Sequence, residues 1–322
     1  MAKMLEPIKA LITPEMLQTV GTVLGLSPEQ VKQGTEIVMP LLATGMARAS
    51  ATPEGQVALM KAVNEADTSV LGNLNGFLGG LTTSGGDDIV KRLLADDGRV
   101  VSALIKEKSG LDIGPLVGMA APMVLGFLNS QVRNQGMDTT ALMKDLKSAS
   151  RSYERKEDES SVIVRQAFKA ADEVRALKGQ LSAAEMELLR AALIAASALV
   201  IGASPSKEKA VKRELEAAVA AVDEAAAKAA PTSLVAALFA DGAASISADS
   251  ISDTPAALKN AMVTLSRVSP SEAESYRKLI IGAAYAAASE VKEGGFLGVG
   301  AKAVSADEQR SIDTISAALG AA

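Results

Sequence analysis

The hydrophobic and polar positions of the chain repeat with the period of an α-helix, and no segment shows the sustained alternation of a β-strand. Helix starts are marked by Ser or Thr followed by Pro, because the hydroxyl caps a free backbone N–H and Pro suits the first helical position. Capping boxes add a Glu or Gln three residues after the cap. The chain is therefore predicted to be all-α. The prolines of the Ser/Thr-Pro pairs are Pro14, Pro28, Pro53, Pro205, Pro255 and Pro270. The capping boxes are Ser27 to Gln30, Ser182 to Glu185, Ser269 to Glu272 and Ser305 to Glu308.

The length of 322 residues fits two helical domains, since one domain typically takes roughly 150 residues. The apolar pattern gives way to charged residues around Arg151 to Glu159, which is typical of an exposed linker or of a helix that bridges two domains through solvent. We therefore predict a first domain over residues 1–147, a charged linker over 148–161 and a second domain over 162–322.

Each domain is predicted to be an internal duplication of helical hairpins. In the first, Gly25-Leu26-Ser27 leads to Met39-Pro40-Leu41-Leu42, and Gly110-Leu111-Asp112 leads to Ala121-Pro122-Met123-Val124. The match needs a small gap, and a Gly-rich stretch from Gly72 to Gly86 is expected to form the loop between the halves.

In the second domain, the segments that begin at Ser182 and Ser269 align without gaps, and each opens a helix that is apolar on nearly every face. Helices of this kind lie at the centre of a fold. Each is expected to be followed by an amphipathic helix, and the two hairpins are expected to pack about a pseudo-twofold axis. The predicted core-facing residues of these amphipathic helices are Val211, Leu215, Ala218, Val222 and Ala225 in one, and Ile312, Ile315 and Leu319 in the other.

Composition restricts the chemistry available to the chain. It has no His and no Cys, which removes the usual general base, the commonest metal ligand, thiol nucleophiles and disulfides. The net charge is −5 and neither half is basic, so no nucleic-acid surface is expected. We predict a protein that is not an enzyme, with no catalytic, cofactor-binding or metal-binding residues.

The first domain resembles the YidB-like family of bacterial domains of unknown function. The resemblance rests on Gly-Leu-Ser followed by a Met-Pro-Leu-Leu helix, on the Gly-rich middle, and on Gly110-Leu111-Asp112 through Ala121 to Gly126. It covers most of residues 15–135. It implies an all-helical bacterial domain and carries over no catalytic residues.

The second domain is similar to the TerB-like tellurite-resistance fold. Phe239-Ala240-Asp241-Gly242 with Ile246-Ser247 resembles the Ala-Asp-Gly-x-x-Ser turn of that family, and the segment from Ser305 to Leu319 resembles its last helix. The turn here has two extra residues and lacks a following Glu. An acidic metal site is therefore not carried over.

Several segments contain residues of the kind that bind metals or phosphates, but we interpret each of them as structural. Asp241, Asp249 and Asp253 form an acidic cluster, but they fill only part of a calcium loop, so we interpret them as helix caps and solvated turns. Gly72 to Gly86 and Gly294 to Lys302 lack the strand and the Gly-Lys-Ser/Thr order of a phosphate loop and are interpreted as helix stops. The pairs Asp87-Asp88 and Asp96-Asp97 are interpreted as helix-end charges.

The longest charge-free run, Ile113 to Val132, has the length of a membrane-spanning helix, yet it contains Pro115, Pro122 and three glycines. We interpret it as a buried hairpin or an oligomer interface. The leading hypothesis is a structural or interaction protein that works by helix–helix association, as a homo-oligomer or scaffold. The alternative is a peripheral envelope-associated or stress-response protein. The first residues lack a signal peptide, so a cytoplasmic location is expected.

Overall fold

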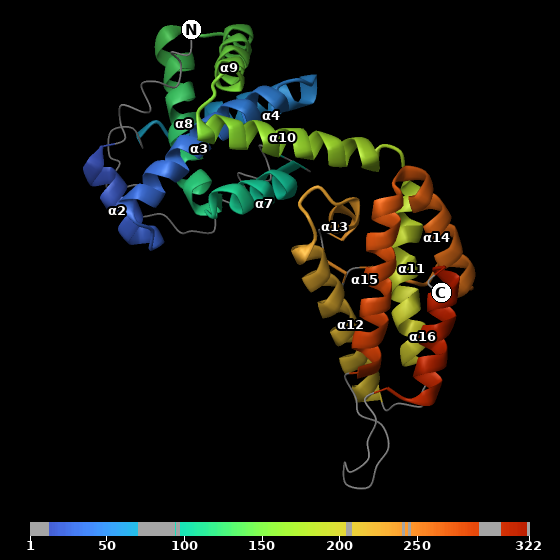
Figure 1. Cartoon of the computed structure of the whole chain (residues 1–322). Coiled ribbons are helices and arrows are strands. Elements are labelled where there is room, and N and C mark those ends of the chain that lie inside the picture. Colours follow the sequence, from blue (N-terminus) through green and yellow to red (C-terminus); the bar gives the residue numbers. More distant parts are fainter. Residues whose placement is uncertain are drawn as a thin grey trace. The chain divides into compact units, whose positions relative to one another are not determined.

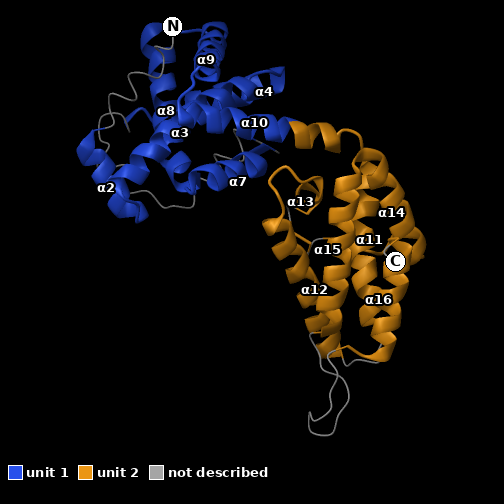
Figure 2. Cartoon of the chain, viewed as in Figure 1, with its two compact units in different colours: residues 1–172 blue, residues 173–322 orange. Residues whose placement is uncertain are grey.

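The computed structural model describes residues 13–69, 94, 97–203, 208–239, 242–243, 246–289 and 304–320. Over these residues the chain forms thirteen helices and no strand, which confirms the all-α prediction (Figure 1). The helices divide into two compact units, residues 1–172 and 173–322 (Figure 2). The bounds are α2 Pro14–Leu24, α3 Pro28–Ala49, α4 Pro53–Glu65, α7 Gly98–Ser109, α8 Gly114–Gln135, α9 Thr139–Glu154, α10 Glu159–Lys178, α11 Ala183–Ile201, α12 Glu208–Lys228, α13 Leu234–Leu238, α14 Thr254–Val268, α15 Pro270–Ser289 and α16 Ala306–Ala318.

The predicted linker over 148–161 spans the end of α9, a short connection and the start of α10. The division between the units falls later, within α10. The charged composition of this stretch reflects exposed positions of two consecutive helices, because Ser150, Tyr153 and Ser161 on the same stretch are buried.

The helix starts follow the predicted capping chemistry at most positions. Ser27, Ser182 and Ser305 each form a complete capping box with the residue three positions later. At α14 the prediction shifts by one residue, because Asp253 and not Thr254 is the cap, and its Oδ1 accepts a hydrogen bond from the Ala256 N–H at 2.9 Å. The predicted start at Pro205 lies outside the described residues.

The fourth predicted box, at Ser269, forms only in part. The Ser269 hydroxyl accepts a hydrogen bond from the Glu272 N–H at 3.4 Å. The Glu272 carboxylate turns to the first turn of α13, where it accepts hydrogen bonds from Val235 N–H at 3.0 Å and from the Ser233 hydroxyl at 3.1 Å. A residue expected to stabilise its own helix therefore stabilises a helix more than thirty residues earlier.

In the first unit, two helix pairs are built in the same way. α2 ends at Gly25 (φ 67°) and α7 ends at Gly110 (φ 72°), a left-handed conformation that favours glycine. Each glycine leads into a helix of 22 residues with an internal proline, Pro40 in α3 and Pro122 in α8. The packing is also reciprocal, because α9 packs on α3 and α4 packs on α8. This pattern supports the predicted duplication of the first domain.

The core of the second unit is built on α11 and α15, which contact each other and all of the other helices from α12 to α16. Both are rich in buried Ala, as expected for helices that are apolar on nearly every face. The Tyr276 hydroxyl donates a hydrogen bond of 2.7 Å to the Leu189 carbonyl, 87 residues earlier, and burial raises the pKa of Tyr276. The same separation of 87 relates Ser182 to Ser269, so the contact joins equivalent positions of the predicted repeat.

The hairpins of the second unit also exchange contacts, because α12 packs on α15 and α16 packs on α11. On α16 the predicted core residues Ile312, Ile315 and Leu319 are all buried. On α12 the prediction is confirmed for Ala218 and Val222, which are buried, and wrong for Val211 and Leu215, which are 38% and 40% exposed, and for the exposed Ala225. The buried residues step by four along that helix and are Glu214, Ala218, Val222 and Ala226. Two of these four are alanines, whose small side chains let the helix pack closely against α15.

Candidate functional site

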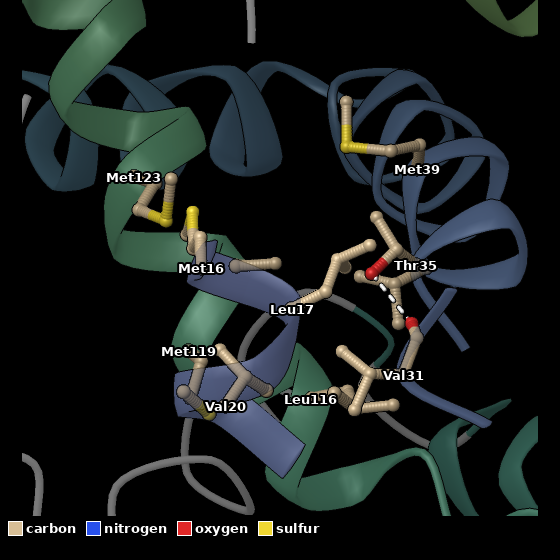
Figure 3. A pocket seen from close by; sticks show the side chains of 11 residues that line it. Met16, Leu17, Val20, Val31, Thr35, Met39, Leu116, Met119 and Met123 are labelled. Atoms are coloured by element: carbon tan, nitrogen blue, oxygen red, sulfur yellow. Dashed lines mark hydrogen bonds between the residues drawn. The ribbon is translucent and has the colours of Figure 1, made fainter. Parts of the chain in front are cut away.

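The feature of the first unit best suited to receive another molecule is an apolar groove between α2, α3 and α8, here called the methionine groove. It holds a cavity of about 50 Å³. Figure 3 shows the α2 side chains between those of α8 and α3, with Met16 on the side of Met123 and Leu17 on the side of Thr35. The lining residues are Met16, Leu17 and Val20 from α2, Val31, Thr35, Val38 and Met39 from α3, and Leu116, Met119, Ala120 and Met123 from α8.

Each wall of the groove is one face of a helix, because its residues recur three or four positions apart. α3 and α8 approach each other closely beneath the groove. A Cβ atom added at Gly34 would lie 2.2 Å from Cδ1 of Leu116, so the glycine lets α8 press its leucine against the α3 backbone. α2 covers this pair only partly, since Met16 and Leu17 are half-buried. The groove is the space along α3 and α8 that α2 leaves uncovered.

The groove offers no chemistry beyond apolar contact. Among the described residues no titratable side chain lines it, and the Thr35 hydroxyl, the one hydroxyl group among them, donates to the Val31 carbonyl at 2.8 Å. Its volume is far below the ~300–1,000 Å³ of pockets that bind small molecules. It corresponds to the space of about two water molecules, at roughly 30 Å³ each. The groove therefore suits one small aliphatic side chain.

Four of the eleven lining residues are methionines. The unbranched thioether side chain has three rotatable bonds and adapts to partners of different shape. Met39, Met119 and Met123 are buried, while Met16 lies at the half-buried rim. The rim can therefore rearrange around an entering side chain while the base stays packed.

The charge-free run Ile113 to Val132 forms most of α8, so the interpretation as a hairpin is wrong, because the run continues as one helix through Pro122. By length and composition α8 would be able to cross a membrane, with a mean hydropathy of 1.2 over its best window. Half of that window is buried inside the fold. One buried polar group anchors the helix, because the Asn129 Nδ2 donates to the Ala66 carbonyl at 2.7 Å, beyond the end of α4. α8 is thus both a core helix and a wall of the groove.

Two of the three acidic residues singled out in the sequence are described, and the carboxylate of one of them, Asp253, is a helix cap. Asp253 caps α14, and the Asp249 N–H donates to the Ser247 hydroxyl at 3.1 Å. Asp241 lies outside the described residues. In the described part of the chain no three acidic side chains gather where they could hold a metal ion.

Asp97 stands at the position before α7 but makes no side-chain cap there. Instead Arg48, in the last turn of α3, lies 3.5 Å from the Asp97 carboxylate and also pairs with Asp172. The Arg48 guanidinium lies over the Phe168 ring at 5.0 Å from its centroid. This cluster ties the end of α3 to α10. Asp96, the pair Asp87-Asp88 and both glycine-rich segments, Gly72 to Gly86 and Gly294 to Lys302, lie outside the described residues.

Sequence reasoning did not identify the methionine groove. Its three faces carry visible helical spacing, such as Leu116, Met119 and Met123, but that spacing is equally typical of a fully buried core. The opening depends on how α2 packs on α3 and α8, and no local signal sets how much of these two helices it covers. The abundance of methionine on these helices was the one available hint.

The described residues form an all-helical protein with two compact units. Each unit is built from helical hairpins that are rich in small residues. Residues 6–131 match the model of a bacterial protein family of unknown function, DUF937. The matched region includes α2, α3, α4, α7 and most of α8, and so all three walls of the methionine groove. No curated protein and no solved structure matches the chain.

Proposed function

We propose that the chain is a non-enzymatic interaction protein that self-associates through its helices. The observation that carries the proposal is the methionine groove, an apolar opening with room for one side chain and without a titratable group. An enzyme site or a cofactor site would need polar groups aimed into a larger space. A groove of this kind suits the insertion of one apolar side chain from a partner helix.

The occupant that we propose is Val57 of a second copy. Val57 lies on α4 and is 71% exposed, which makes it the most exposed large apolar side chain described in the first unit. Its branched side chain has few rotamers, so little conformational entropy is lost when it is buried. Two copies related by a twofold axis would each place Val57 in the groove of the other, a reciprocal contact that closes as a dimer.

Light scattering coupled to gel filtration tests this proposal on the full chain at 1 to 100 μM. Ala120→Leu fills the groove with an apolar side chain, and Val57→Asp puts a charge on the inserted residue. Both variants are expected to be monomeric, because either change prevents insertion. Ala225→Leu, at an exposed position of α12, is the matched control and is expected to remain dimeric.

A wild-type chain that stays monomeric at every concentration would contradict self-association. A dimer that persists in both variants would place the interface elsewhere.

A second candidate function follows from α8. Its length and apolar composition favour a peripheral envelope-associated role, in which part of the apolar surface contacts lipid. Liposome flotation tests this alternative, and a chain that stays at the bottom of the gradient with every lipid composition argues against it.

Two finer relationships belong to the same proposal. We propose that residues 15–135 form a YidB-like domain, which the DUF937 match to residues 6–131 supports. We propose that the second unit is TerB-like, supported by the positive φ of Gly242 in the Ala-Asp-Gly segment and by the Ser305 capping box of α16. A cytoplasmic location stays a prediction, to be tested by fractionation of the source cells.

A further inference from the structure

A stripe of four cations, here called the basic stripe, runs along α9. It consists of Lys144, Lys147, Arg151 and Arg155, which are three or four residues apart and all exposed. The opposite face of the helix is buried through residues such as Leu142 and Leu146. The basic stripe therefore points directly away from the core. It lines a hollow of about 830 Å³, to which α4 contributes Gln56.

None of these four cations forms an ion pair within the described part of the chain. Exposed lysines on other helices are of both kinds, because Lys209 and Lys259 also form no ion pair among the described residues, whereas others are paired. Lys61, Lys212 and Lys228 each pair with a glutamate four residues away on the same helix. No acidic side chain is among the described residues that line the hollow. α9 carries two acids, Asp145 and Glu154, but neither lines the hollow, and neither forms an ion pair with the stripe in the described part of the chain.

The arrangement disfavours the helix that carries it. Like charges three or four residues apart repel each other on a helix surface. The helix dipole compensates only in the last turn, near Arg151 and Arg155, and leaves Lys144 and Lys147 uncompensated. A stripe kept against local stability points to an anion that binds there.

The groups around the hollow indicate which anion. Lysine, arginine, Thr140 and Ser152 are all able to donate hydrogen bonds, which suits phosphate oxygens. The described lining residues include no aromatic ring, so none of them can stack on a nucleic-acid base. No exposed large apolar side chain lies on α9 itself, so the helix that carries the stripe has none to insert into a membrane.

The length of the stripe excludes a single phosphate. At about 1.5 Å per residue, Lys144 to Arg155 extend over roughly 16 Å of helix. A hollow also suits a slender chain better than a flat lipid surface, which would touch only its rim. We propose that the basic stripe of α9 binds a linear polyphosphate anion, held by its linked phosphates alone. This inference does not depend on the methionine groove.

Isothermal titration of the full chain with sodium tripolyphosphate, and with a polyphosphate of about 15 phosphates, tests the inference at low and moderate salt. The wild-type chain is expected to bind the longer anion more tightly, with an affinity that falls as salt rises. The double variant Lys147→Glu/Arg151→Glu is expected to bind at least about tenfold more weakly. Circular dichroism verifies that this variant remains folded.

The matched control is Lys209→Glu/Lys259→Glu, which changes the net charge by the same amount at exposed positions of α12 and α14. It is expected to bind within about twofold of the wild type. Equal losses in both double variants would overturn the proposal, because binding would then follow net charge alone. So would the absence of polyphosphate binding at low salt. Stripe-dependent binding of anionic vesicles or duplex DNA in preference to polyphosphate would also overturn it, because the partner would then be a different polyanion.

Discussion

Gly55 lies where the first turn of α4 meets the end of α3, and its replacement by alanine tests how these helices are seated. A Cβ atom at position 55 would lie 1.8 Å from the Ala49 carbonyl oxygen and 2.9 Å from its carbonyl carbon. Both are backbone atoms, so no side-chain rotation relieves the overlap. The start of α4 would have to move away from α3.

The expected effect of Gly55→Ala is the difference of two terms. Overpacking of this kind typically destabilises by about 1–3 kcal/mol, occasionally more. Alanine returns at most about 1 kcal/mol of helix propensity, and less near a helix end. Because the overlap is with rigid backbone, we place the packing penalty at the upper end of its range. The net loss in the free energy of unfolding is then about 2 kcal/mol.

Urea unfolding followed by circular dichroism measures this loss, with Gly282→Ala as the matched control. A Cβ atom at Gly282, inside α15, would meet no atom within 4 Å. The same substitution there is expected to stabilise the second unit by about 0.5–1 kcal/mol, because glycine is unfavourable inside a helix. A Gly55→Ala variant as stable as the wild type would refute the described packing of α4 on α3.

Three further predictions use the same unfolding assay. Glu272→Ala is expected to destabilise the second unit by about 1–3 kcal/mol, since it leaves two donors of α13 without an acceptor; an unchanged midpoint would show that α13 does not need this cap. Lys147→Glu is expected to stabilise the first unit by about 1 kcal/mol, because it turns two repulsive contacts on α9 into attractive ones; a loss of stability would contradict the repulsion inferred for the basic stripe. The Ser182 backbone N–H, followed by the Ser182 hydroxyl and Arg267, holds the pKa of Glu185 below its usual 4.5, so its contribution is present above that pH and lost as pH falls through the lowered pKa. With Glu185→Gln, the free energy of unfolding should fall less as the pH is lowered. If it falls as much as in the wild type, other groups are responsible for the loss.

The sequence predicted the features that depend on neighbouring residues. The complete capping boxes at Ser27, Ser182 and Ser305 need only atoms within one helical turn, so the spacing of residues determines them. The left-handed ends at Gly25 and Gly110 follow from the freedom of glycine in the same way.

Features set by distant parts of the chain were not predicted. The Glu272 carboxylate could accept hydrogen bonds from the start of its own helix or from α13. Only the fold of the second unit brings the donors of α13 near it. On α12 the predicted and the observed lines share Ala218 and Val222, and only the packed unit shows that Glu214 and Ala226 complete the buried line in place of Val211, Leu215 and Ala225. The methionine groove likewise depends on how far α2 covers α3 and α8.

The central claim is that one copy of the chain inserts Val57 into the methionine groove of another. The chain has no cysteine, so single introduced cysteines report contacts without background. Chains carrying only Val57→Cys are mixed with chains carrying only Ala120→Cys and then oxidised. Val263→Cys, at a position equally exposed in the second unit, replaces Val57→Cys in the control mixture.

We predict rapid formation of a mixed disulfide-linked dimer from Val57→Cys with Ala120→Cys, because the two sulfur atoms would meet within the few ångströms that a disulfide requires. Each variant alone and the Val263→Cys mixture should stay monomeric in denaturing gels. Equal cross-linking in the control mixture, or none in either mixture, would contradict the claim.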